Sequence, residues 1–233
     1  TLLSWLKRRS PNVYRAILEA DSRSVARHNG HGNAMAQVYN HIIMPLAKKR
    51  DKVTQVIWGI EDFKHHYRRH PEGMWLSETA VDLETLGIMA KYGISFTVLA
   101  PSQAQRSRRI GIARRWHTAH AETIENRHAY RLWLEGGRLF NIFFYSPAAS
   151  HAIAFGGLLN NGDQLMHHLM RGFGRAERSQ LVSTATDGET FGHHHKFGEM
   201  AVAYALHKIR QQKVAEITNY AEFLERYLSE WEV

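Results

Sequence analysis

The chain has 233 residues, no cysteine and a formal net charge of +8. The absence of cysteine excludes disulfides, thiolate zinc sites and cysteine nucleophiles, and it fits a reducing compartment, so a cytoplasmic location is expected. A chain of this length can bury one good core, and no stretch reaches the roughly 18 apolar residues of a membrane span, so we expect one soluble domain over residues 1–233 without a membrane partner.

The excess of basic residues is concentrated in residues 106–115, in Arg106-Ser107-Arg108-Arg109 and in Arg114-Arg115. A basic segment of this kind keeps nucleic acid under consideration as a partner. The segment lacks the interleaved aromatic residues of a single-strand binding groove, and blocks of like charge are usually solvated. The favoured interpretation is a solvated basic loop, and nucleic acid is not the expected partner.

Helical and strand-like patterns alternate along the first half of the chain. Apolar residues at three- and four-residue spacing follow Asp51, a candidate N-cap, and predict an amphipathic helix. A short segment over 73–78 comes next, then a helix capped by Asp82 that closes at Gly93, and then an apolar strand over 94–99. A strand, a helix and a strand joined this tightly predict a βαβ unit.

The second half continues with shorter patterns. The polar and basic residues 102–128 predict a loop with at most a short helix. Two β-rich runs, 130–134 and 139–145, flank a Gly-Gly turn and predict a hairpin. The remaining patterns predict, in chain order, helices over 148–159 and 163–171, a strand over 181–186, a helix over 197–211, a strand over 214–218 and a last helix with Asn219 and Glu222 as a capping pair.

These repeated βα units predict an α/β fold with a parallel sheet, closed into a barrel or left open, with an inserted β-hairpin. The chain begins inside a helical pattern and offers fewer strands than a closed βα barrel commonly has. We therefore expect a domain truncated at its N-terminus.

Two acidic residues are predicted to follow strands, where the reactive groups of parallel βα folds gather. Glu78 ends the first short segment, and Asp187 follows the predicted strand 181–186. A pair of carboxyl groups about 5–5.5 Å apart, one ionised and one protonated, is what a retaining glycosidase needs. Acids at strand ends also cap helices and bind loop amides. Trp75 could stack on a sugar ring, although a core tryptophan in a strand is the commoner explanation.

Sixteen histidines raise the question of a metal. Asp187, Glu189 and the run His193-His194-His195, with His31 elsewhere, could supply nitrogen and oxygen ligands to zinc. Adjacent histidines on a loop point in divergent directions, and none of them has the spacing of a helical metal motif. Hydrogen bonds from these imidazoles to sugar hydroxyls are therefore favoured over a metal. The pair His65-His66 falls on a predicted helix and is most simply solvent-facing.

Three blocks of sequence resemble one known family: HGNAMAQVYNHIIMPLA over 31–47, PEGMWLSETAVD over 71–82 and DGETFGHH over 187–194. Their order and spacing resemble glycoside hydrolase family 57 over nearly the whole chain, most closely a bacterial subgroup with a long C-terminal extension. That family includes α-amylases, 4-α-glucanotransferases and α-glucan branching enzymes. The resemblance implies an incomplete (β/α)7 barrel, a retaining mechanism, an α-glucan or oligosaccharide substrate, and neither metal nor cofactor.

The same resemblance implies roles for individual residues. Glu78 matches the nucleophile, and Asp187 matches the general acid/base. The other residues of the three blocks expected to bind substrate are His31, Trp75, Glu189, His193 and His194. The family's N-terminal strand motif is absent from this sequence, which again implies a barrel that lacks its first strand.

Two other interpretations stay open. One is a metal-dependent polysaccharide hydrolase or deacetylase on a related barrel, with Asp187 and the histidines as ligands. The other is a non-catalytic glycan-binding domain. Oligomeric state and the choice between hydrolysis and glycosyl transfer are not predicted.

Overall fold

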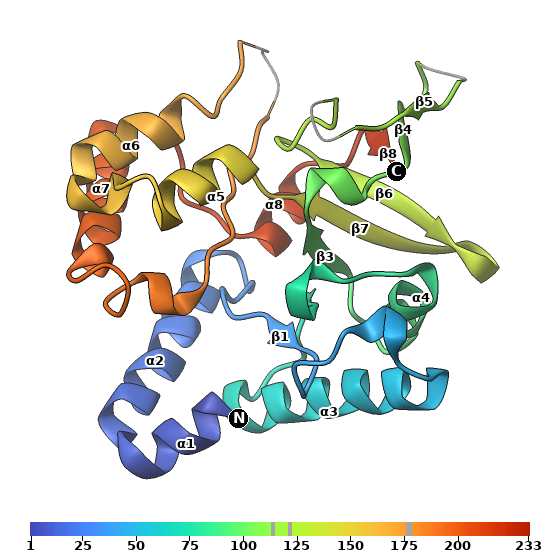
Figure 1. Cartoon of the computed structure of the whole chain (residues 1–233), viewed down its shortest axis with the longest axis horizontal. Helices are drawn as coiled ribbons and strands as arrows, with labels where there is room; N and C mark the ends of the chain where they lie inside the picture. Colours follow the sequence, from blue (N-terminus) through green and yellow to red (C-terminus); the bar gives the residue numbers. More distant parts are fainter. Residues whose placement is uncertain (113–114, 121–122, 176–178) are drawn as a thin grey trace. The chain divides into compact units, whose positions relative to one another are not determined.

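The computed structural model describes residues 1–112, 115–120, 123–175 and 179–233 (Figure 1). Arg114 of the basic segment lies outside the described residues. The chain divides into two compact units, named here unit 1 and unit 2. Unit 1 comprises Thr1–Val98, Tyr130–Ile142 and Asn219–Leu228, and unit 2 comprises Leu99–Ala129, Phe143–Thr218 and Ser229–Val233.

Unit 1 begins with two helices, α1 (Leu2–Arg9) and α2 (Pro11–Arg27). The Thr1 hydroxyl accepts a hydrogen bond from the Ser4 backbone N–H and caps α1. Pro11 opens α2 at a position where a backbone N–H would have no helical partner, so proline is tolerated there.

The parallel strands of unit 1 are short. Strand β1 (Ala36–Gln37) pairs in parallel with β2 (Met74–Trp75), and Gly73 forms a parallel bridge to Phe96 at the start of β3 (Phe96–Leu99). Helix α3 (Lys49–Tyr67) connects β1 to β2, and α4 (Leu83–Lys91) connects β2 to β3. The predicted βαβ unit is therefore confirmed, and the carboxyl ends of β1 and β2 lie at one edge.

The predicted boundaries of these helices are close but not all correct. Asp82 caps α4 as expected, because its carboxylate accepts from the Thr85 backbone N–H at 2.7 Å. Asp51 does not cap α3. That helix begins after Lys48, so Asp51 lies inside its first turn, where its negative charge interacts favourably with the positive end of the helix dipole. Val56, Ile60 and Phe63 form the buried face of α3 that the periodicity predicted.

The predicted hairpin is also present in the structure. Strands β6 (Ala129–Leu134) and β7 (Arg138–Phe144) are joined by the turn Glu135–Gly137, and β7 lies between β3 and β6. Gly136 and Gly137 both have positive φ, 74° and 73°, a conformation that residues with a Cβ rarely adopt. The two glycines that predicted the turn are thus the residues that its backbone requires.

Helix α8 (Tyr220–Arg226) completes unit 1. Asn219 caps it, as predicted, by accepting from the Glu222 backbone N–H at 3.0 Å. The Glu222 side chain is buried, and one of its carboxylate oxygens lies 2.7 Å from His28 Nδ1. Glu222 therefore attaches α8 to the end of α2.

His66 is buried in unit 1, so the prediction that His65-His66 is solvent-facing is wrong for its second member. His66 Nδ1 lies 2.9 Å from the Tyr14 hydroxyl, and Nε2 lies 3.6 Å from Asp62 Oδ1. Helical periodicity explains the error, because His66 lies three residues after Phe63 on the buried face. Burial lowers the pKa of His66 below 6.5, with Asp62 opposing that shift.

This histidine is expected to make the folded state less stable in mild acid. A lowered pKa in the folded state means that the unfolded chain binds more protons once the pH falls below the unfolded value of 6.5. The contribution of neutral His66 to the stability is therefore fully present above pH 6.5 and is lost as the pH falls through the pKa of His66 in the folded state. Urea unfolding between about pH 7 and about pH 5 should show this decline weakened in His66→Gln and unchanged in His65→Gln. An equal decline in both variants would contradict the assignment of this pH dependence to His66.

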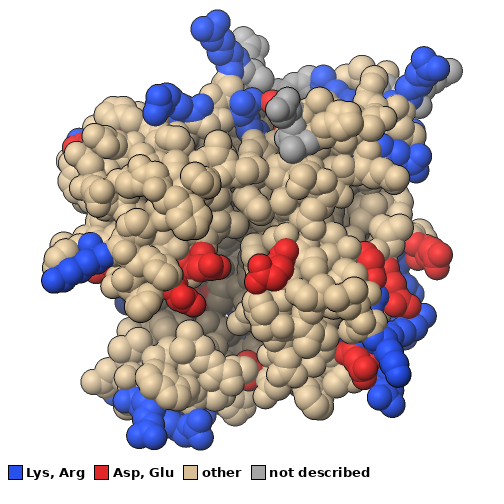
Figure 2. Space-filling view, in the orientation of Figure 1, with Lys and Arg blue, Asp and Glu red and all other residues tan. Residues whose placement is uncertain are grey.

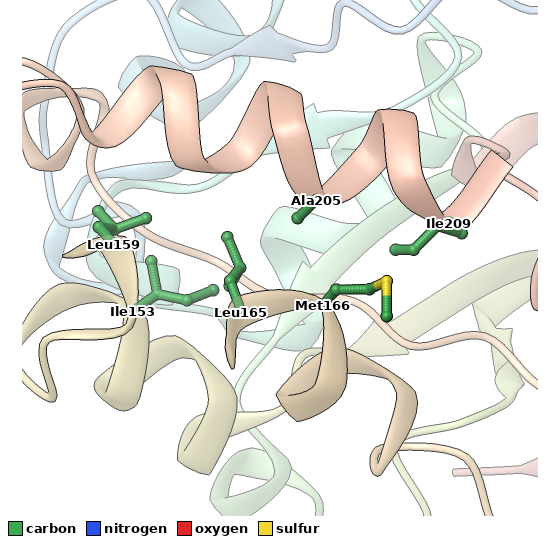
Figure 3. Close-up of a cluster of buried hydrophobic side chains, with 6 residues drawn as sticks. All are labelled: Ile153, Leu159, Leu165, Met166, Ala205 and Ile209. Carbon is green, nitrogen blue, oxygen red and sulfur yellow. The ribbon is translucent and has the colours of Figure 1, made fainter. Parts of the chain in front are cut away.

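Unit 2 is built around three helices. Helices α5 (Pro147–Ala154) and α6 (Gly162–Met170) lie opposite α7 (Gly198–Gln212), and Figure 3 shows apolar side chains from both sides meeting between them. The interlocking of these side chains removes apolar surface from water and fixes the three helices together. The buried cluster consists of Ile153, Leu159, Leu165, Met166, Ala205 and Ile209.

Residues 106–109 of the basic segment form a strand and not the predicted loop. Strand β4 (Arg106–Arg109) pairs antiparallel with both β5 (His117–Thr118) and β8 (Trp231–Glu232). Arg108 reaches Glu232 at 2.6 Å, and the Arg106 and Arg108 guanidinium groups each lie 4.6 Å from the centre of the Trp116 ring. The pattern failed here because the neutralising acid lies more than a hundred residues away along the chain.

The described basic residues do not gather into one surface on the face drawn in Figure 2. Their side chains lie at separate places there, singly or in small groups. A nucleic-acid site would need a continuous basic patch or stripe. The expectation that nucleic acid is not the partner stays a prediction.

Two predicted strands of unit 2 are wrong. Residues 181–186 form no described strand, because their backbone groups bond to scattered partners: Leu181 N–H donates to the Arg127 carbonyl, and Ala185 N–H donates to the Ser150 hydroxyl. Residues 214–218 likewise form no described strand and connect α7 to α8 along the chain. Both runs have the composition of strands, but in the described part of the chain neither has a neighbouring strand with which to form a ladder.

The α/β class with parallel strands is confirmed, but the incomplete (β/α)7 barrel is not. In unit 1 the strands form the pair β1-β2 and the neighbours β3-β7-β6, in unit 2 they form β8-β4-β5, and the strands that the structure describes form no closed barrel. Among the described residues, none of the helices is both long enough and apolar enough to span a bilayer.

Candidate active site

Glu78 lies just beyond the carboxyl end of β2, in the 3₁₀ turn η2 (Ser77–Thr79). The residues before it, Leu76 and Ser77, are buried, whereas 70% of the Glu78 side chain is exposed. Two backbone hydrogen bonds close the turn: Thr79 N–H donates to the Leu76 carbonyl and Ala80 N–H to the Ser77 carbonyl, both at 3.0 Å. The turn therefore fixes the backbone of Glu78 and leaves its carboxylate accessible.

The backbone of this turn is strained. Glu78 has φ 55° and ψ 21°, and Thr79 follows with φ 53°, so two successive residues with a Cβ lie in the left-handed region. Each such residue costs on the order of 1–2 kcal/mol. Strain of this kind persists only where the surroundings impose it, and it is concentrated at functional sites.

His41 contacts Glu78 directly. Its Nε2 lies 2.9 Å from Glu78 Oε1, although the two residues are 37 positions apart. The segment that carries His41 follows β1 and is fixed by Gln55 of α3: Tyr39 N–H donates to the Gln55 carbonyl and Asn40 N–H to the Gln55 side-chain oxygen. His41 is not among the residues that the sequence patterns predict for the site. What could have indicated His41 is its place in the 31–47 block, just after β1, the strand that pairs in parallel with β2.

His31 lies between two carboxylates. Its Nδ1 is 2.7 Å from Glu72 Oε1, and its Nε2 is 3.4 Å from Glu225 Oε2. The Asn29 amide, which donates to Glu225 at 2.7 Å, and then His31 lower the pKa of that carboxyl, and desolvation opposes them. His31 Nε2 is buried and makes no hydrogen bond within the described residues. The substrate-binding role of His31 stays a prediction.

A small pocket lies next to this histidine in unit 1. Its wall includes Asn33, Glu72, Gly73, Phe96 and Tyr220. Trp75 of β2 is half-buried and lies opposite Gln37 of β1, as expected for a strand tryptophan. Its stacking on a sugar ring stays a prediction.

Asp187 is exposed and precedes the 3₁₀ turn η6 (Gly188–Thr190) of unit 2. The loop that follows is closed by backbone hydrogen bonds: Thr190 N–H donates to the Asp187 carbonyl, His194 N–H to the Glu189 carbonyl and His195 N–H to the Thr190 carbonyl. The His195 ring lies 2.7 Å from the Ala154 carbonyl and attaches the loop to α5. Asp187 is therefore presented by an ordered loop.

The three histidines of this loop do not converge. His194 Nε2 lies 3.5 Å from Glu189 Oε2, the His193 and His194 rings are 4.9 Å apart, and His195 faces the Ala154 carbonyl. Among the residues that the structure describes, no group of three or more His, Cys, Asp or Glu could hold a metal ion. The divergence expected of adjacent histidines on a loop is thus observed.

The predicted site residues fall into two sets. Unit 1 contains Glu78, Trp75 and His31, and unit 2 contains the remainder, Asp187, Glu189, His193 and His194. The approach of Glu78 to Asp187 within about 5–5.5 Å stays a prediction.

The sequence profile of the family described as "Glycosyl hydrolase family 57" matches residues 1–231. The chain belongs to glycosyl hydrolase family 57. The family that the three blocks indicated is therefore confirmed, and the bacterial subgroup stays a prediction. A search of curated proteins finds no match to this family 57 chain.

Solved structures share its fold. A 4-α-glucanotransferase from Thermococcus litoralis matches 98% of this family 57 chain at 18% identity with a TM-score of 0.67, and an exo-type maltose-forming amylase from Pyrococcus sp. ST04 matches 97% at 18% identity with a TM-score of 0.71. A candidate polysaccharide deacetylase from Mycobacterium smegmatis matches 88% at 14% identity with a TM-score of 0.56. The matched regions cover 33%, 35% and 65% of those chains, respectively.

Proposed function

We propose that this family 57 chain carries the catalytic groups of a retaining enzyme that acts on α-glucans, with Glu78 as nucleophile and Asp187 as general acid/base. The observation that carries the proposal is Glu78 itself: an accessible carboxylate on a strained turn beyond a parallel strand, in a chain matched along 231 residues to a glycosyl hydrolase family. The names of two structural neighbours, a glucanotransferase and a maltose-forming amylase, support the α-glucan as substrate.

The reaction proceeds in two displacements. The Glu78 carboxylate attacks the anomeric carbon while the glycosidic C–O bond breaks, and Asp187 gives its proton to the departing oxygen. In the second step Asp187 takes a proton from water or from a sugar hydroxyl, whose oxygen attacks the same carbon and releases Glu78. Water as acceptor gives an amylase, and a sugar hydroxyl gives a glucanotransferase or branching enzyme. The predicted substrate-binding residues hold the sugar during both steps: His31, Trp75, Glu189, His193 and His194.

Changing Asp187 to asparagine should trap the glycosyl-enzyme. An aryl maltooligosaccharide with an activated leaving group needs little protonation, so the first step continues, whereas the second step lacks its base. Intact-mass measurement should show a covalent sugar adduct, and peptide mapping should place it on Glu78. Asp51→Asn, an Asp-to-Asn change on the exposed start of α3, is the matched control and should turn over without accumulating adduct. A trapped sugar on another residue would contradict the assignment of Glu78.

The similarity of fold to the candidate deacetylase leaves one second candidate, a metal-dependent polysaccharide hydrolase with Asp187 and the loop histidines as ligands. The arrangement of those side chains in the described residues does not favour it, because no group of three or more of them could hold a metal ion. The two candidates differ in a simple measurement. A metal-dependent enzyme should lose activity with a chelator and regain it with zinc, whereas the two-carboxylate mechanism should be unaffected.

A further inference from the structure

The contact between His41 and Glu78 is the feature of unit 1 that the proposed mechanism leaves unused. We infer that His41 is a positioning residue that holds the Glu78 carboxylate in the orientation needed for attack, an inference that rests on the proposed role of Glu78 as nucleophile. An ionised carboxylate can only accept hydrogen bonds, so His41 Nε2 donates to Oε1 across the 2.9 Å contact. Oε2 is then the oxygen assigned to the anomeric carbon.

The contact contributes little to folding. The His41 and Glu78 side chains are 69% and 70% exposed, and a polar contact between side chains this exposed adds little to stability in water. Neither side chain fills a core position. A role in orienting an accessible carboxylate therefore explains the contact better than a role in folding.

Both partners are held at their backbones, which is what orientation requires. On one side, Gln55 of α3 fixes the segment before His41 through hydrogen bonds to the Tyr39 and Asn40 N–H groups, at 3.3 and 2.6 Å. On the other side, the strained turn at Glu78 is closed by its own backbone hydrogen bonds. The parallel register of β1 with β2, Gln37 opposite Trp75, brings the two segments to the same edge.

The contact with His41 reduces the number of conformations that the Glu78 side chain samples before the substrate binds. A glutamate side chain that is largely exposed samples several rotamers, and ordering it costs entropy when the substrate binds. A carboxylate held by an imidazole is ordered before the substrate arrives, so its oxygen can start near the attacking geometry. Loss of the imidazole should therefore lower the rate of attack and leave ground-state substrate binding almost unchanged.

The test compares two substitutions at one position. His41→Phe keeps a planar ring but removes the N–H donor, and His41→Gln keeps a donor at a similar distance from the backbone. Pre-steady-state release of the aryl group from an activated aryl maltooligosaccharide reports formation of the glycosyl-enzyme. We expect His41→Phe to slow this step about 10- to 100-fold with a KM within about threefold of wild type, and His41→Gln to recover most of the rate. His207→Phe, at an exposed position of α7, is the matched control and should behave as wild type.

The possible results separate this inference from the proposed function. Wild-type rates in His41→Phe, together with loss of activity in Glu78→Gln, would overturn the role of His41 and leave the function standing. No turnover in wild type would overturn both. A readout without substrate covers the case in which His41→Phe fails to fold: the 15N resonance of His41 Nε2 should move in Glu78→Gln and stay in place in Asp51→Asn. A resonance unchanged in Glu78→Gln would overturn the inference.

Discussion

Replacing Glu78 with glutamine is expected to lower kcat on maltooligosaccharides by at least about a thousandfold, because an amide oxygen cannot form the glycosyl ester that a carboxylate forms. The substitution keeps the size of the side chain and a hydrogen-bond acceptor for His41. Since the side chain is 70% exposed, the strained turn should survive the change. Initial rates measured over a range of substrate concentrations give kcat and KM separately, and thermal unfolding checks that the variant is folded.

A matched control and a rescue make this result specific. Glu61→Gln, on the exposed side of α3 next to Lys64, removes the same charge and should leave kcat within about twofold of wild type. In Glu78→Ala, added azide should restore turnover of an activated α-glycoside and give a product of inverted anomeric configuration, because azide attacks from the face that the carboxylate occupied. A Glu78→Gln variant with wild-type kcat would show that another group is the nucleophile.

The elements that the sequence predicted correctly are those determined by local interactions. The βαβ unit follows from helical periodicity, the Asp82 cap and the short links between its elements. The hairpin follows from two glycines that adopt positive φ. In these cases the information lies within about ten residues, which is the range over which sequence patterns act.

The errors come from partners that are distant in sequence. Residues 181–186 have the composition of a strand, but a strand requires a neighbouring strand. This segment instead hydrogen-bonds to the Arg127 carbonyl and the Ser150 hydroxyl, which lie far from it in the sequence. The strand β4 was missed for the opposite reason. Its arginines suggest a solvated loop until Glu232 and Trp116 are placed beside them.

The candidate site shows the same division. Glu78 could be proposed from its position after a strand and from the resemblance of its block to a family motif. Its left-handed backbone could not, because neither glutamate nor threonine favours positive φ and nothing nearby in the sequence indicates a strained turn. His41 could not be selected among sixteen histidines until the pairing of β1 with β2 was known.

The ion pair between Lys52 and Asp82 is expected to make the largest contribution to the stability of the N-terminus of α4, which follows the Glu78 turn. The Lys52 side chain is 3% exposed, and its ammonium group lies 2.5 Å from Asp82 Oδ2 and 3.0 Å from Glu84 Oε2. Asp82 also caps α4 through Thr85. Asp82→Ala removes the cap and leaves a buried ammonium group with one partner, so we expect a loss of about 2–4 kcal/mol in the free energy of unfolding, measured with urea at neutral pH.

Two further variants separate the cap from the charge. Asp82→Asn keeps an oxygen for Thr85 and should lose less than Asp82→Ala. Glu84→Ala removes the more exposed partner and should lose least, since Asp82 still neutralises Lys52. A loss from Glu84→Ala as large as that from Asp82→Ala would show that the charge is held mainly by Glu84.

The pH dependence provides an independent test of the same ion pair. Burial raises the pKa of Asp82, but the hydrogen bonds from Lys52 and Thr85 outweigh it and bring the pKa below 3.8. Burial lowers the pKa of Lys52, but its bonds to Asp82 and Glu84 outweigh it and bring the pKa above 10.5. The Asp82 contribution is therefore present above pH 3.8 and lost as the pH falls through the folded pKa, and the Lys52 contribution is present below pH 10.5 and lost as the pH rises. The difference in the free energy of unfolding between wild type and Asp82→Ala should be constant between these two pH limits and should shrink in acid. If Asp82 acted only as a helix cap, without the lysine, Lys52→Met would be as stable as wild type over the same pH range. It would also lose stability in acid to the same extent as wild type.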